Sequence, residues 1–177
     1  VVDPQNSVFL DYWQSRDASL RSPVGSKIEG IGRPRVEPSF IPDVVDEMLR
    51  VPDAASVATA LWLETLLGRK VGASTGTNMW GVLQLAVRMR QEGRSGSLVT
   101  LLCDSGERYL ESYYNPQWVA ANIGDISPWQ AQIAEMLQAC RPQHGILRFI
   151  RRDREIALRP VCEKCTEFLR TDTVVMQ

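Results

Sequence analysis

Apolar residues recur at helical spacing in four stretches of the chain, and each recurrence predicts a helix packed on one face. One stretch runs from Asp53, a good N-terminal cap, to Gly68, a helix-terminating glycine. A second reaches Gly93, and a third covers residues 129–137. A fourth begins at residues 41–43, where proline is tolerated at the first helical position. The apolar positions of the helices before residue 129 are Val44, Val45, Met48, Leu49, Val57, Ala58, Ala60, Leu61, Leu67, Met79, Val82, Leu83, Ala86 and Met89.

Short apolar runs between these helices predict strands. They lie at residues 1–2, at about residues 70–73 and at residues 98–103. The last run is almost wholly apolar, as expected for a strand buried on both faces. Helices that alternate with strands over short connections are typical of βαβ units. We therefore expect an α/β fold with a partial parallel sheet and flanking helices.

Two regions lack this regularity. Residues 5–39 contain recurrent proline and glycine, which predicts a long, shaped loop, and such loops are often functional. Beyond residue 140 the chain becomes rich in arginine, and residues 146–158 indicate a hairpin. The predicted organisation is one α/β domain over residues 1–127, followed by a basic tail, residues 128–177, that is irregular or contains a hairpin.

The 177 residues, 44% of them hydrophobic and 23% charged, have the composition of a globular protein. The net charge of −1 gives no indication of nucleic-acid or membrane binding, and no apolar run approaches the roughly 20 residues that cross a bilayer. The four cysteines follow no secretion signal, which favours reduced thiols in a cytoplasmic protein. Because the chain opens with neither methionine nor a leader, we expect it to begin inside a larger protein.

Two polar elbows follow the predicted strands, at residues 72–76 and 103–106. Adjacent strands of one parallel sheet would place both elbows at the same edge, where ligands usually bind. Both elbows carry hydroxyl groups, and both precede predicted helices, whose free N–H groups favour an acceptor or an anion. Helix capping is the alternative, since Asp104 with Glu107 fits a capping box and a hydroxyl of the first elbow fits an N-terminal cap.

Glycine spacing elsewhere does not identify a nucleotide site. Residues 30–32 read Gly-Ile-Gly but lack the third glycine and the helix of a dinucleotide fingerprint. Residues 25–27 read Gly-Ser-Lys but lack the spacing of a phosphate-binding P-loop. Neither segment is therefore assigned to a nucleotide.

Three ordered segments carry a resemblance to a known enzyme family: KIEGIGRPRVEPSFIPDVVDE, KVGASTGTNMWGVLQLA and LVTLLCDSGERYLESYY. They resemble the carboxyl-terminal half of the cysteine synthase and cystathionine β-synthase family, pyridoxal-phosphate enzymes of fold type II (tryptophan-synthase-β-like). The opening VVDPQNS resembles the strand after that family's phosphate loop. The similarity extends from residue 1 to about residue 125. Within the family, STGTN and NPQWVAANIGD resemble the cysteine-degrading, desulfhydrase-like members or the cysteine-synthesising ones.

The resemblance implies a pyridoxal phosphate cofactor and β-elimination or β-replacement on cysteine, O-acetylserine or a related amino acid, in a homodimeric complete enzyme. The serine at the position of Ser105 would hydrogen-bond the pyridine nitrogen. A neutral hydroxyl does not hold a proton on the ring as a carboxylate would, so the ring is a poorer electron sink, which disfavours transamination. The other implied contacts are to the substrate, from Gly30 and Gly32, and to the ring edge, from Ser74, Thr75 and Gly76.

The family's Schiff-base lysine, substrate-carboxylate loop and phosphate cradle would all precede residue 1. The lysines of this chain are Lys27, Lys70 and Lys164, and none has the family's lysine context. Without that lysine no group binds the cofactor covalently or removes the α-proton. We therefore expect the chain to be a fragment that is inactive alone. The alternative is a non-catalytic α/β remnant whose tail binds a metal or a protein partner.

The tail offers one candidate metal site. Cys140, His144, Cys162 and Cys165 bracket the predicted hairpin and can supply three thiolates and one imidazole to tetrahedral zinc. Free cysteines and a surface histidine are the alternative, because a single Cys-x2-Cys pair does not define a zinc site. Acidic residues are interspersed with the arginines of the tail, which favours a solvated surface over a nucleic-acid interface.

Overall fold

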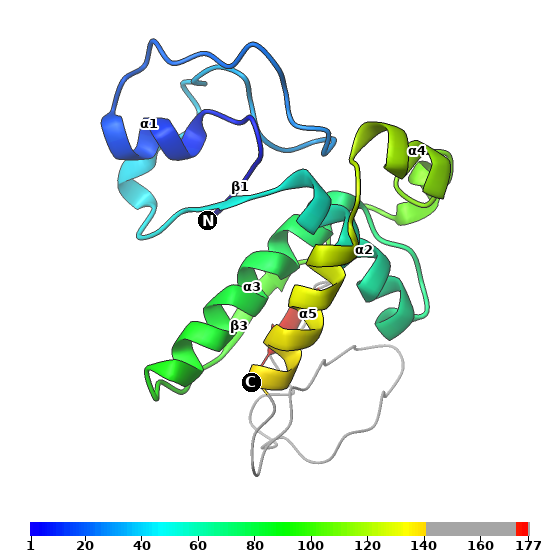
Figure 1. Cartoon of the computed structure of the whole chain (residues 1–177). Helices are drawn as coiled ribbons and strands as arrows, with labels where there is room; N and C mark the ends of the chain where they lie inside the picture. The colour runs from blue at the N-terminus through cyan, green and yellow to red at the C-terminus, as the bar shows by residue number, and fades with distance from the viewer. Residues whose placement is uncertain (141–172, 177) are drawn as a thin grey trace.

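A computed structural model describes residues 1–140 and 173–176 of the chain. The fold is α/β, as predicted from the sequence (Figure 1). Its elements in chain order are β1 (Val2–Pro4), α1 (Phe9–Ser15), the 3-10 turn η1 (Pro42–Val44), β2 (Leu49–Val51), α2 (Asp53–Leu67), α3 (Ala73–Gln91), β3 (Leu98–Leu101), the 3-10 turn η2 (Gly106–Tyr109), α4 (Pro116–Asn122), α5 (Ser127–Ala139) and β4 (Thr173–Met176). Within these described residues no helix is both long and apolar enough to cross a bilayer.

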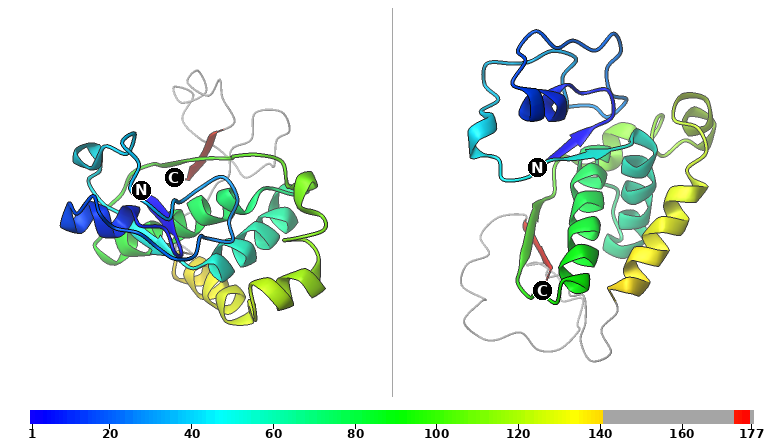
Figure 2. Two further views of the ribbon diagram at one scale, coloured as in Figure 1. Left: turned by 90° about the horizontal axis from the view of Figure 1, so that it is seen from above. Right: turned by 60° about the vertical axis from the view of Figure 1, so that its left-hand side comes forward.

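Three helices, α2, α3 and α5, form the packed centre of the molecule, and Figure 2 shows α3 and α5 side by side. Their apolar faces enclose Leu63, Trp80 and Leu83, each at most 2% exposed. Gly76 allows α3 to approach α2 closely, because a side chain there would meet the carbonyl oxygen of Ser56. The helices predicted from apolar spacing at these three places are confirmed.

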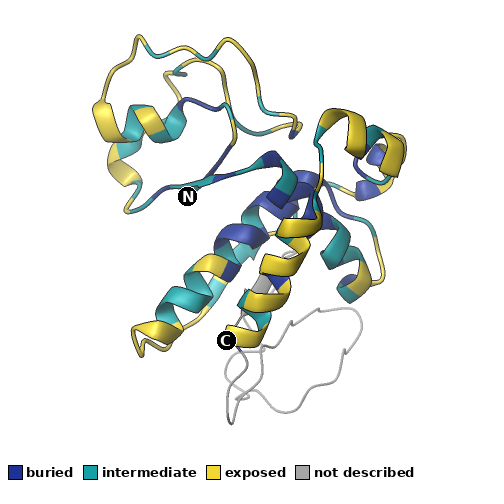
Figure 3. Ribbon diagram, in the orientation of Figure 1, coloured by how far each residue is buried: buried dark blue, intermediate teal, exposed yellow. Residues whose placement is uncertain are grey.

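Helix α5 begins at the predicted boundary of the basic tail and packs against α2 and α3. Its Ile133 is 2% exposed within the main core. The ring of Trp129 meets that of Trp80 edge-on, with centroids 5.5 Å apart. Figure 3 shows that the opposite face of α5 is exposed. Residues 127–139 therefore contribute to the same core as the first part of the chain, and the predicted hairpin at residues 146–158 lies outside the described residues.

The described strands form two short pairs. β1 and β2 run parallel, with Val2 opposite Leu49, whereas β3 and β4 run antiparallel. The prediction that residues 98–103 form a strand buried on both faces is wrong in its burial, since Val99 and Leu101 are each 65% exposed. An apolar strand is covered only where neighbours flank it, and the described strands supply β3 with a partner on one edge alone.

The helix predicted to begin at residues 41–43 is wrong beyond its first turn. The turn η1 ends at Val44, and the chain then extends into β2. The N–H of Leu49 donates to the carbonyl of Val1 at 2.9 Å, so pairing with β1 fixes an extended backbone there. Tertiary pairing outweighs apolar spacing in this short segment.

The strand predicted at residues 70–73 is also wrong. It reduces to one bridge between Val71 and Ser105, because α3 begins at Ala73, several residues before its first predicted apolar position. The connection from α2 to α3 is therefore a short elbow that ends directly in a helix.

Residues 5–39 form the predicted long loop, which is interrupted by α1, a helix that the sequence pattern does not predict. Figure 1 shows this region gathered on one side of the helical core, beside β1. The rings of Phe9 and Phe40 stack with centroids 4.6 Å apart, and the indole N–H of Trp13 donates to the carbonyl of Val45 at 3.1 Å. These contacts give the loop a defined path back to β2.

Candidate functional site

The two polar elbows lie side by side in the structure. The N–H of Gly72 donates to the carbonyl of Asp104 at 3.0 Å, and Val71 forms the isolated bridge with Ser105. The start of α3 and the segment that leaves β3 are thus held next to each other. The predicted pairing of two parallel strands is wrong, because the bridge between Val71 and Ser105 is antiparallel. The contact nevertheless places groups from both elbows next to each other.

Two glycines make this close approach possible. A side chain at Gly72 would occupy the place of the Asp104 carboxylate. A side chain at Gly106 would lie 2.5 Å from Cβ of Lys70 and equally close to the backbone nitrogen of Val71. The elbows therefore depend on glycine for their contact with each other.

Ser105 is exposed and precedes the turn η2. Its hydroxyl oxygen accepts a hydrogen bond from the N–H of Glu107 at 3.4 Å. The cap of this turn is thus Ser105, and the capping box predicted from Asp104 and Glu107 does not form. A hydroxyl that accepts one bond keeps its proton to donate to another acceptor. Ser105 therefore combines a local capping role with an available donor.

The three candidate residues at the start of α3 are more buried than Ser105. Thr75 is fully buried, and its Oγ1 accepts the N–H of Cys103 at 2.9 Å. Gly76 faces α2, and Ser74 is 6% exposed. Capping by Ser74 or Thr75 is not observed, because the cap position is Gly72, which has no side-chain cap. Thr75 and Gly76 thus build the elbow.

Two backbone N–H groups at the start of α3 take no part in the hydrogen bonds of the helix. The N–H groups of Thr75 and Gly76 both donate to the carbonyl of Gly72, at 3.0 and 3.4 Å. The N–H groups of Ala73 and Ser74 precede these bonds and have no helical acceptor. The backbone at this helix start, beside Ser105, can therefore donate to an acceptor or an anion.

Gly30 and Gly32 lie in the long loop, and both adopt the left-handed backbone region, with φ of 84° and 70°. A side chain at Gly30 would meet no atom within 4 Å, whereas one at Gly32 would lie 2.6 Å from Cγ of Pro4. Gly32 therefore packs against the end of β1, and Gly30 borders open space. This fits a loop whose backbone is accessible at Gly30.

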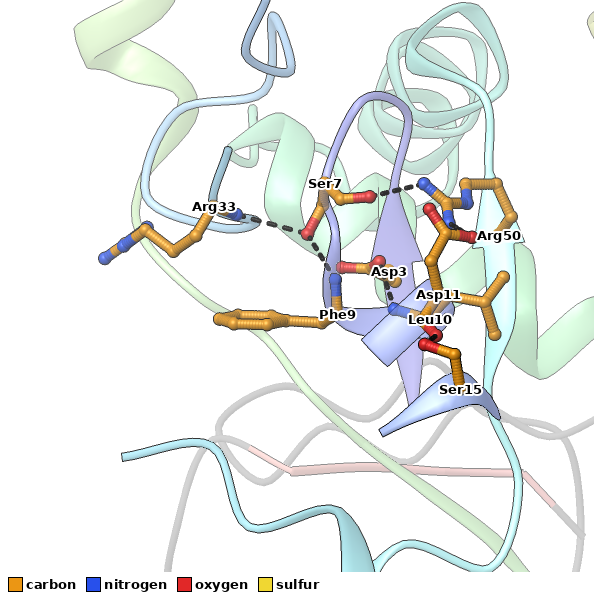
Figure 4. A network of polar contacts seen from close by, with 8 residues as sticks. All are labelled: Asp3, Ser7, Phe9, Leu10, Asp11, Ser15, Arg33 and Arg50. Atoms are coloured by element: carbon orange, nitrogen blue, oxygen red, sulfur yellow. Dashed lines mark hydrogen bonds and ion pairs between the residues drawn. The ribbon is translucent and has the colours of Figure 1, made fainter. Parts of the chain in front are cut away.

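The loop is fixed after Gly32 by polar groups in β1 and directly after it (Figure 4). Oγ of Ser7 accepts the N–H of Arg33 at 3.1 Å, and Asp3 accepts the N–H of Leu10 at 2.9 Å. Burial raises the pKa of Asp3 above its ordinary value of 3.8. The guanidinium of Arg50 donates to the carbonyl of Ser7 at 2.5 Å. The sequence pattern does not predict this network, although the VVDPQNS motif contains two of its members.

The loop is fixed before Gly30 by Asp53. The sequence predicts this residue as a helix cap, but it is the first residue of α2, and its carboxylate bonds elsewhere. Oδ1 accepts the hydroxyl of Ser26 at 2.8 Å, and Oδ2 accepts the N–H of Lys27 at 2.6 Å. Burial raises the pKa of Asp53. Its role as an anchor of the loop leaves no signal in local sequence.

One buried cluster joins the loop to the elbows. Ile28 from the loop, Ala73 from the start of α3, and Tyr109 and Tyr113 from the segment after Ser105 all belong to it. The predicted site segments are thus neighbours across a shared apolar layer. The part of the long loop around Gly30 and Gly32, residues 26–33, is called here the glycine loop. The structure brings the glycine loop, the start of α3 and the Ser105 elbow to one region of the molecule.

The predicted metal ligands are described only in part. Cys140 directly follows α5 as its C-terminal cap, is 8% exposed, and has its pKa raised by burial. His144, Cys162 and Cys165 lie outside the described residues, so the zinc site stays a prediction. Over residues 1–140 there is no group of three or more side chains suited to hold a metal ion.

Comparison with known proteins adds an independent finding. The chain is 51% identical over 141 residues to L-cysteine desulfhydrase Cds1 of Mycobacterium tuberculosis, a match that covers 80% of this chain and 38% of that relative. It is 32% identical over 135 residues to cysteine synthase 2 of Emericella nidulans, covering 70% of this chain and 30% of the relative. Cysteine synthase 2 of Schizosaccharomyces pombe is 30% identical over 116 residues, a match that covers 64% of this chain and 29% of that relative.

No protein-family model matches the chain. The chain spans between 29% and 38% of the length of these curated relatives. The matches nevertheless name the same cysteine desulfhydrases and synthases that the three sequence segments resemble. The chain therefore belongs to the cysteine synthase family of fold type II pyridoxal-phosphate enzymes.

Proposed function

We propose that the chain forms the cofactor-ring and substrate-loop part of a pyridoxal-phosphate enzyme that performs β-elimination or β-replacement on cysteine or an O-acetylserine-type amino acid. The desulfhydrase reaction is the preferred assignment, since the relative at 51% identity is named an L-cysteine desulfhydrase. We further propose a cytoplasmic enzyme that is homodimeric when complete. Its described cysteines, Cys103 and Cys140, are free thiols, in keeping with that compartment.

The observation that carries this proposal is the contact between the two elbows. It puts the exposed hydroxyl of Ser105 next to the start of α3, through the bond from Gly72 to Asp104 and the bridge at Val71. A hydroxyl donor and free backbone N–H groups are suited to the ring nitrogen and the oxygen atoms of pyridoxal phosphate. The residues present thus fit an edge of this cofactor.

Pyridoxal phosphate, when bound, withdraws electrons from the α-carbon of an amino acid. In this chain Ser105 would orient the ring by donating to its nitrogen without adding a proton. The backbone at Gly30 would approach the substrate, since no side chain covers it. Thr75 would hold the two elbows in register through its bond to Cys103.

We propose that the chain alone is inactive, because the amine of Lys70 is held in an ion pair and Lys27 does not have the family's lysine context. Nζ of Lys70 lies 2.5 Å from Oε1 of Glu64 and 5.3 Å from the ring centroid of Tyr114. This ion pair raises the pKa of Lys70, which opposes the neutral amine that a covalent bond to the cofactor requires. Lys27 lies on the glycine loop, where its backbone N–H donates to the carboxylate of Asp53.

Addition of pyridoxal phosphate to the purified chain tests this assignment. We expect no visible absorbance band of a lysine-bound cofactor and no release of sulfide from L-cysteine. Mixing the chain with the uncovered part of the M. tuberculosis desulfhydrase, supplied as a separate polypeptide, is expected to restore both signals. A band from the chain alone would contradict its inactivity, and failure of the mixture would contradict the assignment. Stoichiometric zinc in the chain would favour the non-catalytic alternative.

The role of Ser105 is tested in the restored enzyme. Ser105→Asp is expected to shift the products towards transamination, because a carboxylate keeps the ring nitrogen protonated. Ser95→Asp, an exposed serine before β3, is the matched control and should leave the product ratio unchanged. An unchanged ratio in Ser105→Asp would remove this residue from the cofactor site.

A further inference from the structure

Three tyrosines of one short segment bond to three different parts of the candidate site. The hydroxyl of Tyr109 donates to Oδ2 of Asp104 at 2.6 Å. Those of Tyr113 and Tyr114 donate, each at 2.8 Å, to backbone carbonyls of the glycine loop and of the first elbow. These three residues, called here the tyrosine cluster, therefore contact the glycine loop and both elbows.

Tyr113 fixes the glycine loop just before Gly30. Its hydroxyl donates to the carbonyl of Lys27 at 2.8 Å and accepts the N–H of Glu29 at 3.0 Å. Oγ of Ser7 holds the N–H of Arg33 on the other side. Only residues 30–32 lie between these fixed points, so the position of Tyr113 decides where the accessible backbone of Gly30 lies.

Tyr114 fixes the first elbow in the same manner. Its hydroxyl donates to the carbonyl of Val71 at 2.8 Å and accepts the N–H of the same residue at 2.9 Å. Val71 also forms the bridge to Ser105. One side chain thus satisfies both backbone groups of the residue that joins the two elbows, groups that would otherwise be buried without partners.

Tyr109 completes the arrangement at the second elbow. Its hydroxyl bonds Asp104, whose other carboxylate oxygen fills the space above Gly72. Its ring lies 4.9 Å from that of Tyr113, centroid to centroid, so the anchors of the loop and of the elbow are in contact. Burial is the main cause that raises the pKa of Tyr109, Tyr113 and Tyr114. All three phenols therefore remain protonated donors at neutral pH.

We propose that the tyrosine cluster sets the distance between the Gly30–Gly32 loop and the Ser105 elbow, so that its members are positioning residues for substrate relative to cofactor. This proposal rests on the proposed function for its catalytic meaning only. The hydroxyl of Tyr113 binds a loop that lies 84 to 86 residues earlier in the sequence. The hydroxyl of Tyr114 binds Val71, which lies 43 residues earlier. A substitution of tyrosine by phenylalanine removes those hydroxyls while it keeps the rings in the core.

Backbone hydrogen exchange of the chain itself, followed residue by residue, tests the positioning. Tyr113→Phe is expected to speed exchange of the Glu29 amide about tenfold and to leave the Val71 amide unchanged. Tyr114→Phe is expected to do the reverse and is the matched control. A uniform change that includes the core amide of Leu63 would indicate a general loss of stability and would overturn the proposal. Unchanged exchange at both amides would also overturn it.

A second variant covers the case in which Tyr113→Phe does not fold. Ser26→Ala removes a loop contact on the opposite side of Lys27, because its hydroxyl otherwise donates to Asp53 and accepts the N–H of Ile28. If Tyr113 is the main anchor, exchange at Glu29 should rise less than about threefold in Ser26→Ala. A larger rise would show that the Asp53 anchor at Ser26 and Lys27, rather than Tyr113, sets the position of Glu29, and would contradict the role given to Tyr113.

Steady-state kinetics of the restored enzyme provide the catalytic readout. Tyr113→Phe is expected to raise KM for L-cysteine several-fold with little change in kcat, because the loop is displaced while the cofactor elbow is kept. An equal fall in kcat with KM unchanged would contradict the assignment of Tyr113 to substrate positioning. If the restored protein bound no pyridoxal phosphate, the proposed function would fail, whereas the exchange experiment would still decide the role of the tyrosines.

Discussion

The carboxylate of Asp53 accepts the backbone N–H of Lys27 at 2.6 Å, so the first residue of α2 holds a loop that lies 26 residues earlier in the chain. The same carboxylate accepts the hydroxyl of Ser26. Removing the Asp53 carboxylate leaves the N–H of Lys27 and the hydroxyl of Ser26 without this acceptor in a half-buried position. The glycine loop therefore depends on a side chain that belongs to the helical core.

Asp53→Ala is expected to lower the free energy of unfolding by about 2 kcal/mol, because hydrogen bonds to a charged group are lost. The pKa of Asp53 is raised in the folded state above its ordinary value of 3.8. The folded protein then binds more protons than the unfolded chain, so the Asp53 contribution falls as pH rises through the raised pKa. The difference between wild type and Asp53→Ala should be larger at pH values below 3.8 than at neutral pH.

Urea unfolding at the two pH values measures this difference. Asp46→Ala is the control, since Asp46 is exposed and is expected to change stability by less than about 0.5 kcal/mol. A difference that grows with rising pH would contradict the expected direction. Asp3, whose pKa is also raised, is present in both proteins and cancels in the comparison.

Gly72→Ala is expected to destabilise the protein by about 2 kcal/mol, because the new methyl group would collide with the carboxylate of Asp104. Gly25→Ala should be nearly neutral, since a side chain there meets no atom within 4 Å. In the Asp104→Ala background the cost of Gly72→Ala should shrink by more than half if the collision is its cause. Additive effects in this double-mutant cycle would refute the contact between the elbows.

Ile133→Ala tests whether α5 belongs to the core. Ile133 is 2% exposed among residues of α2 and α3, and truncation of such a side chain costs about 2 to 4 kcal/mol. Gln130→Ala, one turn earlier in α5, is the control and should change the thermal midpoint little. A loss below about 0.5 kcal/mol for Ile133→Ala would instead place α5 with an independent tail.

Val99→Thr is expected to slow aggregation of the chain without loss of stability. Val99 is 65% exposed on β3, and an exposed apolar strand promotes pairing with other molecules. Val44→Thr removes a similarly exposed valine outside the strands, 76% exposed, and should have a smaller effect. Light scattering at matched concentrations gives the comparison, and equal effects of both substitutions would rule out β3 as the origin of aggregation.

Apolar spacing is sufficient to predict α2, α3 and α5, because these helices bury one face and their spacing records it. It fails where pairing between distant segments decides the structure. Leu49 has the spacing of a helix but pairs with Val1, and β3 has the composition of a buried strand, although the described strands flank it on one edge alone. Such outcomes depend on what the rest of the molecule supplies.

The candidate site shows the same division. The elbows and the glycine loop can be located from their glycine and hydroxyl residues, which mark turns locally. The groups that hold these segments in place cannot, because Asp53 and Tyr113 reach partners 26 to 86 residues away. A carboxylate before a helix resembles a cap, and a tyrosine in an apolar segment resembles core, so neither residue signals its hydrogen-bond partner.

The backbone at Gly30 has a positive φ of 84°, and a side chain added there would meet no atom within 4 Å. The chirality of the residue at this position therefore matters more than the size of its side chain. An L-amino acid is strained there, whereas one of opposite chirality would adopt this conformation readily. D-alanine introduced at position 30 by semisynthesis should consequently preserve the shape of the loop, and L-alanine should not. The mouth of the proposed site thus owes its form to stereochemistry at a single α-carbon.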